Sequence, residues 1–121
     1  MTAEKSNTAL RAEFVAMLGL LFTYANRLDI RFILTSVHRT AEEQKRLFDE
    51  GKSKLDGYVK KSKHQLWRAV DVCIIDERDN LCWEHPDYAR LGEYWETIGG
   101  VWGGRWASLN DIYHFELGGG A

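Results

Sequence analysis

A carboxylate in the middle of an apolar run is the feature that most constrains the fold of this chain. Residues 68–75 read RAVDVCII, and the β-branched content of the run predicts a buried strand. Side chains alternate along a strand, so Asp71 shares a face with Cys73 and Ile75, and the valines beside it take the opposite face. A buried carboxylate without a partner is costly. The fold must therefore bring Asp71 to a cation or to several hydrogen-bond donors.

Two kinds of cation could meet Asp71: an arginine, Arg39 or Arg68, or a bound metal. An ion pair is the ordinary explanation of a single buried aspartate. His64, however, precedes Asp71 by seven residues, and His114 lies in a second compact motif, NDIYHFE. Two imidazoles and one carboxylate form a common ligand set for catalytic zinc. A chain with four histidines and 18 acidic residues offers many such trios, so spacing alone leaves both explanations open.

Hydrophobic periodicity and capping signals predict three helices. The first is a long amphipathic helix over residues 8–29. The second begins at residues 40–43, TAEE, which have the form of a capping box, and is closed by Gly51. Pro86 suits the first turn of a third helix, residues 87–98. The lysine-rich segment between the second helix and the opening strand has no sustained apolar period and is interpreted as a surface loop.

Strands alternate with these helices. Besides residues 68–75, we expect strands at residues 31–37 and 112–117, and a short antiparallel partner at residues 81–83. This order favours an α+β class, in which a small antiparallel sheet is faced by helices. The 121 residues suffice for one domain with its own core, so residues 1–121 are expected to form a single domain.

The composition limits the kinds of binding partner and environment expected for this chain. A formal net charge of -2 gives no bulk attraction for nucleic acid. The most apolar N-terminal run, AMLGLLFTYA, is shorter than the roughly 20 residues that span a bilayer and shows no cleavage pattern, so neither a membrane segment nor an export signal is expected. Cys73 and Cys82 do not form a disulfide framework or a zinc ribbon, although one bridge between them stays open. The five lysines of residues 51–63 predict a solvated surface, or alternatively attraction to an anionic partner surface.

Several blocks together resemble a known family. They are S-x-H-x(6)-D with Ala two positions before the Asp, W-G-G-x-W, D-x-x-H-F-E, and the S-x-x-R-T-x-x-x-Q element in SVHRTAEEQKRLF. In this order they resemble the M15 zinc peptidases, which include D-alanyl-D-alanine carboxypeptidases and phage L-alanyl-D-glutamate endolysins. The blocks extend over residues 36–117. The resemblance implies the D-Ala-D-Ala-peptidase/hedgehog-like fold and Zn²⁺ as cofactor.

The resemblance also implies roles for individual residues. His64, Asp71 and His114 fall on the three zinc ligands, and Asp111 falls on the catalytic acid/base of the endolysin-like branch. Arg39 falls on the arginine that contacts substrate and the polarised carbonyl. Such chemistry suits these residue types, because a ligand set of two imidazoles and one carboxylate leaves zinc positively charged, a carboxylate can relay a proton, and an arginine stays charged.

Other positions are expected near the same cleft. Gln44 and Ser62 occupy family motif positions beside it, and Trp106 is either part of a wall for a sugar-peptide substrate or part of the core. The sequence departs from the family pattern at Trp67, where glycine is usual, which leaves the local substrate pocket open. A histidine at the end of a strand is usually structural, and this is the expectation for His38.

Strand parity separates two candidates for the base. Asp111 and His114 are an odd number of residues apart, so Asp111 must lie in a bend before the final strand if the two share a site. Glu116 shares a face with His114. It is therefore either a rival base or a partner that orients the imidazole.

The expected function is zinc-dependent hydrolysis of a peptide bond in peptidoglycan stem peptides, by a phage or prophage endolysin of the L-alanyl-D-glutamate type. Such an enzyme would be a monomer, made in the bacterial cytoplasm without a signal peptide and acting on the cell wall. A D-alanyl-D-alanine carboxypeptidase or dipeptidase is the alternative enzyme. A non-catalytic zinc-stabilised binding module is the alternative of another class.

Overall fold

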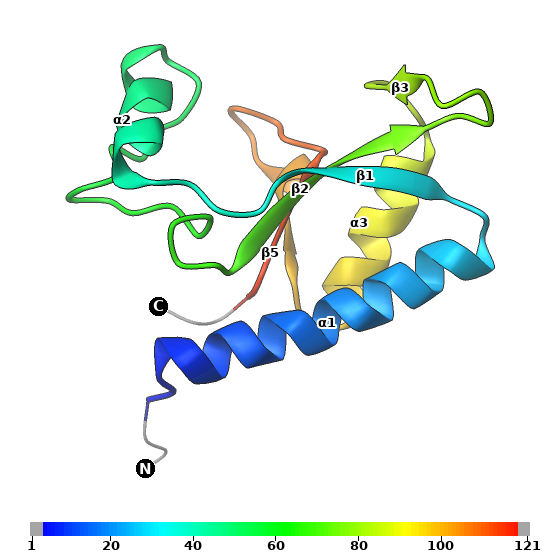
Figure 1. Ribbon diagram of the computed structural model, residues 1–121, viewed down its shortest axis with the longest axis horizontal. Helices are drawn as coiled ribbons and strands as arrows, with labels where there is room; N and C mark the ends of the chain where they lie inside the picture. The colour runs from blue at the N-terminus through cyan, green and yellow to red at the C-terminus, as the bar shows by residue number, and fades with distance from the viewer. Residues whose placement is uncertain (1–3, 119–121) are drawn as a thin grey trace.

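Strand β2 lies at the centre of the sheet. The computed structural model describes residues 4–118 (Figure 1). The sheet order is β1-β2-β5-β4, β3 pairs with the far end of β2, and all pairings are antiparallel. The strands are β1 (Arg31–Ser36), β2 (Ala69–Ile75), β3 (Leu81–Cys82), β4 (Val101–Trp102) and β5 (His114–Glu116). The helices are α1 (Asn7–Arg27), α2 (Ala41–Asp49), α3 (Asp87–Thr97) and the short 3₁₀ helix η1 (Gly103–Arg105). The α+β class with a small antiparallel sheet is confirmed.

The alternation predicted for β2 is confirmed. Val70, Val72 and Ile74 belong to the hydrophobic core. On this side, α1 and α3 cover the sheet (Figure 1), and Phe14 of α1 meets Trp95 of α3 edge to face with ring centroids 5.9 Å apart. The opposite face of β2 carries the carboxylate. The apolar helices thus stabilise a strand whose other face is free to hold polar groups.

The capping box predicted for the second helix is confirmed, and each of the other two α-helices begins at a residue suited to that place. Thr40 and Glu43 form both hydrogen bonds of the capping box at the start of α2. Ser6 caps α1, because its hydroxyl oxygen accepts from the amide of Ala9 at 3.1 Å. Pro86 stands directly before α3. These local bonds satisfy amides that the first helical turn leaves unpaired.

The C-terminal part differs from the prediction. The last strand begins at His114 rather than at residue 112, and β4 with η1 was not predicted. The indole of Trp102 donates to the carbonyl of Ile112 at 2.9 Å, and that of Trp95 donates to the carbonyl of Glu116 at 2.8 Å. The amide of His114 donates to the carbonyl of Asp111 at 3.2 Å, which closes a turn before β5.

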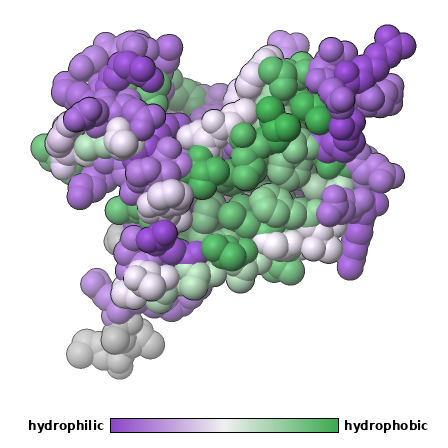
Figure 2. Space-filling view, in the orientation of Figure 1, coloured by the Kyte–Doolittle hydropathy of each residue, from purple (hydrophilic) through white to green (hydrophobic). Residues whose placement is uncertain are grey.

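An apolar face lies between β1 and α1, while the part of the surface around α2 is hydrophilic (Figure 2). Helix α1 is also, by length and composition, the one helix of residues 4–118 able to cross a membrane, a property it shares with apolar core helices. It contributes Phe14 and Leu21 to the core. Cys73 and Cys82 are free thiols, so the bridge left open by the sequence is not formed.

Candidate active site

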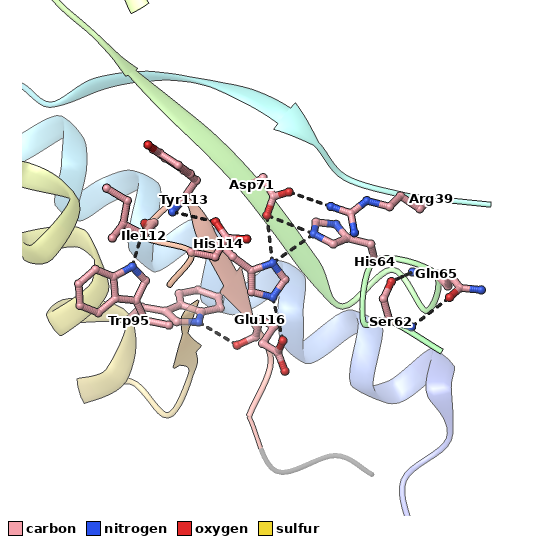
Figure 3. A network of polar contacts seen from close by, with 12 residues as sticks. Arg39, Ser62, His64, Gln65, Asp71, Trp95, Ile112, Tyr113, His114 and Glu116 are labelled. Atoms are coloured by element: carbon pink, nitrogen blue, oxygen red, sulfur yellow. Dashed lines mark hydrogen bonds and ion pairs between the residues drawn. The ribbon is translucent and has the colours of Figure 1, made fainter. Parts of the chain in front are cut away.

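Three side chains converge on the polar face of the sheet (Figure 3). Asp71 Oδ1 lies 3.1 Å from His64 Nε2 and 3.0 Å from His114 Nδ1. The two imidazole nitrogens are 3.2 Å apart. One oxygen and two nitrogens thus form a nearly equilateral triangle of possible ligand atoms.

The sheet and a turn supply these donors. Asp71 of β2 and His114 of β5 are direct partners in the antiparallel register. Directly opposed residues on one face of a sheet have neighbouring side chains, so pairing alone brings these two together. His64 comes from a tight turn immediately before β2, in which the amide of Arg68 donates to the carbonyl of Lys63 at 2.9 Å.

The chemistry of the donors fits a cation. His114 Nε2 lies 2.8 Å from Glu116 Oε1 and donates to it, so a neutral His114 presents a lone pair at Nδ1. That lone pair faces the carboxylate of Asp71 and the second imidazole at about van der Waals contact or closer. Electron-rich atoms at such separations repel unless a proton or a metal ion lies among them. The residues present therefore suit a divalent metal with nitrogen and oxygen ligands.

The same electrostatics governs protonation. Burial lowers the pKa of His114, but hydrogen bonds with Asp71 and Glu116 outweigh it and raise the pKa to about 9. Burial raises the pKa of Asp71, but hydrogen bonds with His114 and His64 outweigh it, so the net pKa lies well below its usual value. In the metal-free protein a proton therefore takes the cation's place, and a metal must displace it.

Arg39 is a second partner of the buried Asp71 carboxylate. Its Nη2 donates to Asp71 Oδ2 at 3.1 Å, and its Nη1 donates to the side-chain oxygen of Gln44 at 3.0 Å. Asp71 thus has one oxygen on an arginine and the other on the imidazoles. The two explanations of its burial coexist, because the carboxylate has two oxygens.

Asp111 lies in the turn before β5, as strand parity required. Its amide donates to the carbonyl of Gly103 at 3.0 Å, and its carboxylate accepts from the amide of Tyr113. Burial and the nearby charge of Asp71 raise the pKa of Asp111 above its usual value. A carboxyl group with a raised pKa can exchange protons more readily near neutrality, as a general base or acid must.

A cleft of about 650 Å³ opens over these residues. Its lining includes Arg39, His64, Asp111 and His114, together with the predicted Ser62 and Trp106. The Trp106 ring lies 4.9 Å from the ring of His114, centroid to centroid, so it stands beside the candidate centre rather than in the hydrophobic core.

The position of Gln44 differs from the expectation. The family motif placed it beside the cleft, but its side chain is fully buried at 0% exposure and does not line the cleft. Its amide nitrogen donates to Ser53 Oγ and to the carbonyl of Leu55, and its oxygen accepts from Arg39. A fully hydrogen-bonded, buried amide has no surface to offer a substrate. Gln44 instead positions Arg39 and ties α2 to the loop that follows it.

Two other outcomes concern the cleft wall. Within residues 4–118, His38 forms no hydrogen bond or ion pair with the candidate ligands. Its ring stacks on Trp67, with centroids 4.3 Å apart. The lysine loop was interpreted mainly as a solvated surface, yet four of its lysines line the cleft. The sequence feature that could have indicated this position is that the loop runs directly into Ser62 and His64.

Comparison with known proteins agrees with this site. The family model described as D-alanyl-D-alanine carboxypeptidase, Peptidase_M15_4, matches residues 56–117, just over half of the chain. The chain belongs to this family. The match contains all three candidate metal ligands and Asp111, whereas Arg39 lies outside it. The family assignment made from the sequence blocks is confirmed.

Individual relatives of this M15 chain are distant. Peptidoglycan L-alanyl-D-glutamate endopeptidase CwlK of Bacillus subtilis is 24% identical over 73% of this chain, and the chain spans 61% of the length of CwlK. The L-Ala D-Glu endopeptidase ChiX of Serratia marcescens superposes with a TM-score of 0.71, at 24% identity, over 88% of this chain and 78% of ChiX.

The D,D-pentapeptidase VanY from the VanB-type resistance cassette, solved as an E175A mutant in complex with Zn(II), gives a TM-score of 0.64 at 21% identity. That match covers 88% of this chain and 71% of VanY. At these identities the two structures establish the fold.

Proposed function

We propose that this chain is a zinc-dependent peptidase that cleaves a peptide bond in peptidoglycan stem peptides, as an endopeptidase of the L-alanyl-D-glutamate type. The observation that carries this is the triangle of His64 Nε2, Asp71 Oδ1 and His114 Nδ1 on the floor of a cleft. Family membership and the likeness to CwlK and ChiX support the substrate class. The sequence resemblance supports the finer assignment, an endolysin-type enzyme of a phage or prophage.

These three atoms would hold the zinc ion. When bound there, zinc supplies a Lewis acid for the peptide carbonyl and lowers the pKa of a water ligand toward neutrality. The guanidinium of Arg39 still has hydrogens beyond those given to Asp71 and Gln44. We assign it to the oxygen of the scissile carbonyl, where developing negative charge needs a donor.

Asp111 is assigned as the proton carrier. It lines the same cleft as Arg39 and His114, and burial raises its pKa. It would accept a proton from the attacking water and return it to the leaving amine. Glu116 is assigned a different role, because its carboxylate is already engaged by Nε2 of His114 and so orients that imidazole.

Asp111→Asn tests this assignment. Removing the base should lower the rate of hydrolysis of purified peptidoglycan by about 10²-fold to 10⁴-fold while the bound zinc stoichiometry stays unchanged. His64→Ala should lose both zinc and hydrolysis. Asp49→Asn, which alters a surface carboxylate on α2, is the matched control. Full hydrolysis by the Asp111→Asn protein would refute the assigned base. A wild-type protein that binds zinc but hydrolyses nothing would instead favour a non-catalytic zinc-stabilised module.

The family description favours one alternative, D-alanyl-D-alanine carboxypeptidase activity. Mass analysis of the fragments from digested peptidoglycan separates the two. An endopeptidase of the proposed type releases peptides that begin with D-glutamate, whereas a carboxypeptidase releases free D-alanine. Chelation should abolish either activity, and added zinc should restore it.

A further inference from the structure

We propose that Lys54 and Lys61, at the rim of the cleft, select substrates with a free carboxylate beside the scissile bond. The inference rests on the proposed peptidase function and adds a specificity element to it. The relevant ligand is the free α-carboxylate of the D-residue whose nitrogen is released on cleavage.

The charge of the cleft differs from that of the whole chain. Five cationic side chains line the cleft against two anionic ones, whereas the full sequence carries a formal charge of -2. One of the two carboxylates, Glu116, is engaged by His114. A cleft lined by one sign of charge concentrates field within it and attracts ligands of the opposite sign.

Lys54 and Lys61 line this cleft together with residues 106–109. Lys54 Nζ donates to Ser108 Oγ at 2.6 Å, so its ammonium connects the lysine loop to that segment. Lys61 is exposed and lies three residues before His64. A third rim lysine, Lys52, is paired with Glu50 at 3.0 Å, which makes it the weaker candidate. Two lysines thus line the same cleft as the candidate ligands His64 and His114.

The chemistry of the stem peptide supplies a matching group. Its D-glutamate is joined onward through the γ-carboxyl, so the α-carboxylate stays free on the carbon next to the scissile nitrogen. An ammonium ion meets such a group in a charge-assisted hydrogen bond, which is stronger than a neutral one. Amidation of the same carboxyl, as in D-isoglutamine, keeps the shape and removes the charge. The rim lysines should therefore distinguish the two forms.

Two synthetic muropeptides test this: L-Ala-γ-D-Glu-L-Lys and its D-isoglutamine counterpart. We expect kcat/KM to favour the free carboxylate by about tenfold, the size of one charge-assisted bond. The Lys54→Met/Lys61→Met double variant should bring the ratio close to one by weakening only the acidic peptide. Lys60→Met, from the same loop but not in the cleft lining, is the control and should keep the wild-type ratio.

Binding provides a readout apart from turnover. Calorimetry with the Asp111→Asn protein should show the same preference in Kd, and the lysine variants in that background should lose it. Equal cleavage of both peptides by the wild type would overturn the inference while the peptidase function stands. Equal weakening of both peptides in the double variant would also overturn it, because it indicates a general attraction for anionic wall polymers. Failure to cleave either peptide would refute the proposed function, and the inference with it.

Discussion

The three candidate ligands come from two structurally different parts of the site, which we call the sheet half (Asp71 and His114) and the turn half (His64). Asp71 and His114 are paired residues on adjacent strands of a sheet, whereas His64 lies in a turn between the lysine loop and β2. In the sheet half, backbone register sets the distance between donors. In the turn half, no ladder fixes the donor, and its position depends on how the turn itself is held.

The two histidines show the same contrast in their outer contacts. His114 has a partner at each ring nitrogen, because Glu116 accepts from Nε2. His64 is 99% buried by side chain, yet among residues 4–118 its Nδ1 has no hydrogen-bond partner. Apart from its contact with Asp71, the imidazole of His64 is therefore oriented by packing, whereas His114 also has an outer hydrogen bond to Glu116. Substitutions that act on only one half can separate these two means of preorganisation.

Gly103→Ala should break the sheet half. A Cβ at this position would stand 2.5 Å from the carbonyl oxygen of Asp111 and 3.1 Å from the Cβ of His114. We expect a loss of about 1–3 kcal/mol in the free energy of unfolding from overpacking. Displacing these groups by about 1 Å should cost a further factor of about 10² in activity. Chemical denaturation and peptidoglycan hydrolysis measure the two effects.

Gly19→Ala is the matched control, because a Cβ there meets nothing within 4 Å. Gly19 lies inside α1, so this change should stabilise the protein by about 0.5–1 kcal/mol. If Gly103→Ala behaved like Gly19→Ala, close approach at Gly103 would not be what positions Asp111.

Glu116→Ala should weaken the sheet half without breaking it. Loss of the partner that orients His114 is expected to lower zinc affinity by about 10-fold to 100-fold, as for other outer partners of metal-bound histidines. Glu116→Gln retains an acceptor and should lose less. A competition titration with a chromogenic chelator gives the affinities. Glu96→Ala, which removes a surface partner of Arg105, is the control. Unchanged zinc affinity in a folded Glu116→Ala protein would contradict the positioning role.

The sequence predicted best what depends on local rules. The capping box of α2 and the alternation along β2 need only neighbouring residues, and both are confirmed. Parity also placed Asp111 in a turn before β5. Each follows from the fixed period of a helix or strand.

What the sequence did not predict depends on contacts between distant segments. The burial of Gln44 follows from the packing of the lysine loop over α2, through Ser53 and Leu55. The late start of β5 is accompanied by a bond from the distant indole of Trp102 to the carbonyl of Ile112. Sequence periodicity indicates neither feature, because tertiary packing determines which residues bond to these side chains. The place of the lysines on the cleft wall was missed for the same reason.

The turn half has a specific weakness at Trp67. This position, where the family pattern has glycine, adopts a φ of 60°, a left-handed conformation that costs about 1–2 kcal/mol for a residue with a Cβ. The indole offsets this by stacking on His38 and by lying under the guanidinium of Arg11, 5.3 Å from the ring centroid. Such contacts contribute about 0.5–1.5 kcal/mol each. A glycine and a tryptophan thus solve the same local problem differently.

Comparison of Trp67→Gly with Trp67→Ala isolates this strain. Both variants lose the stack, but only alanine keeps the cost of the positive φ, so the glycine variant should be more stable by about 1 kcal/mol. This order is the reverse of that at position 19 in α1, where alanine is favoured. Denaturant midpoints of the wild type, Gly19→Ala, Trp67→Gly and Trp67→Ala show whether the order of stability reverses between the two positions. If alanine equalled or exceeded glycine at position 67, backbone strain at this position would not explain the family's glycine.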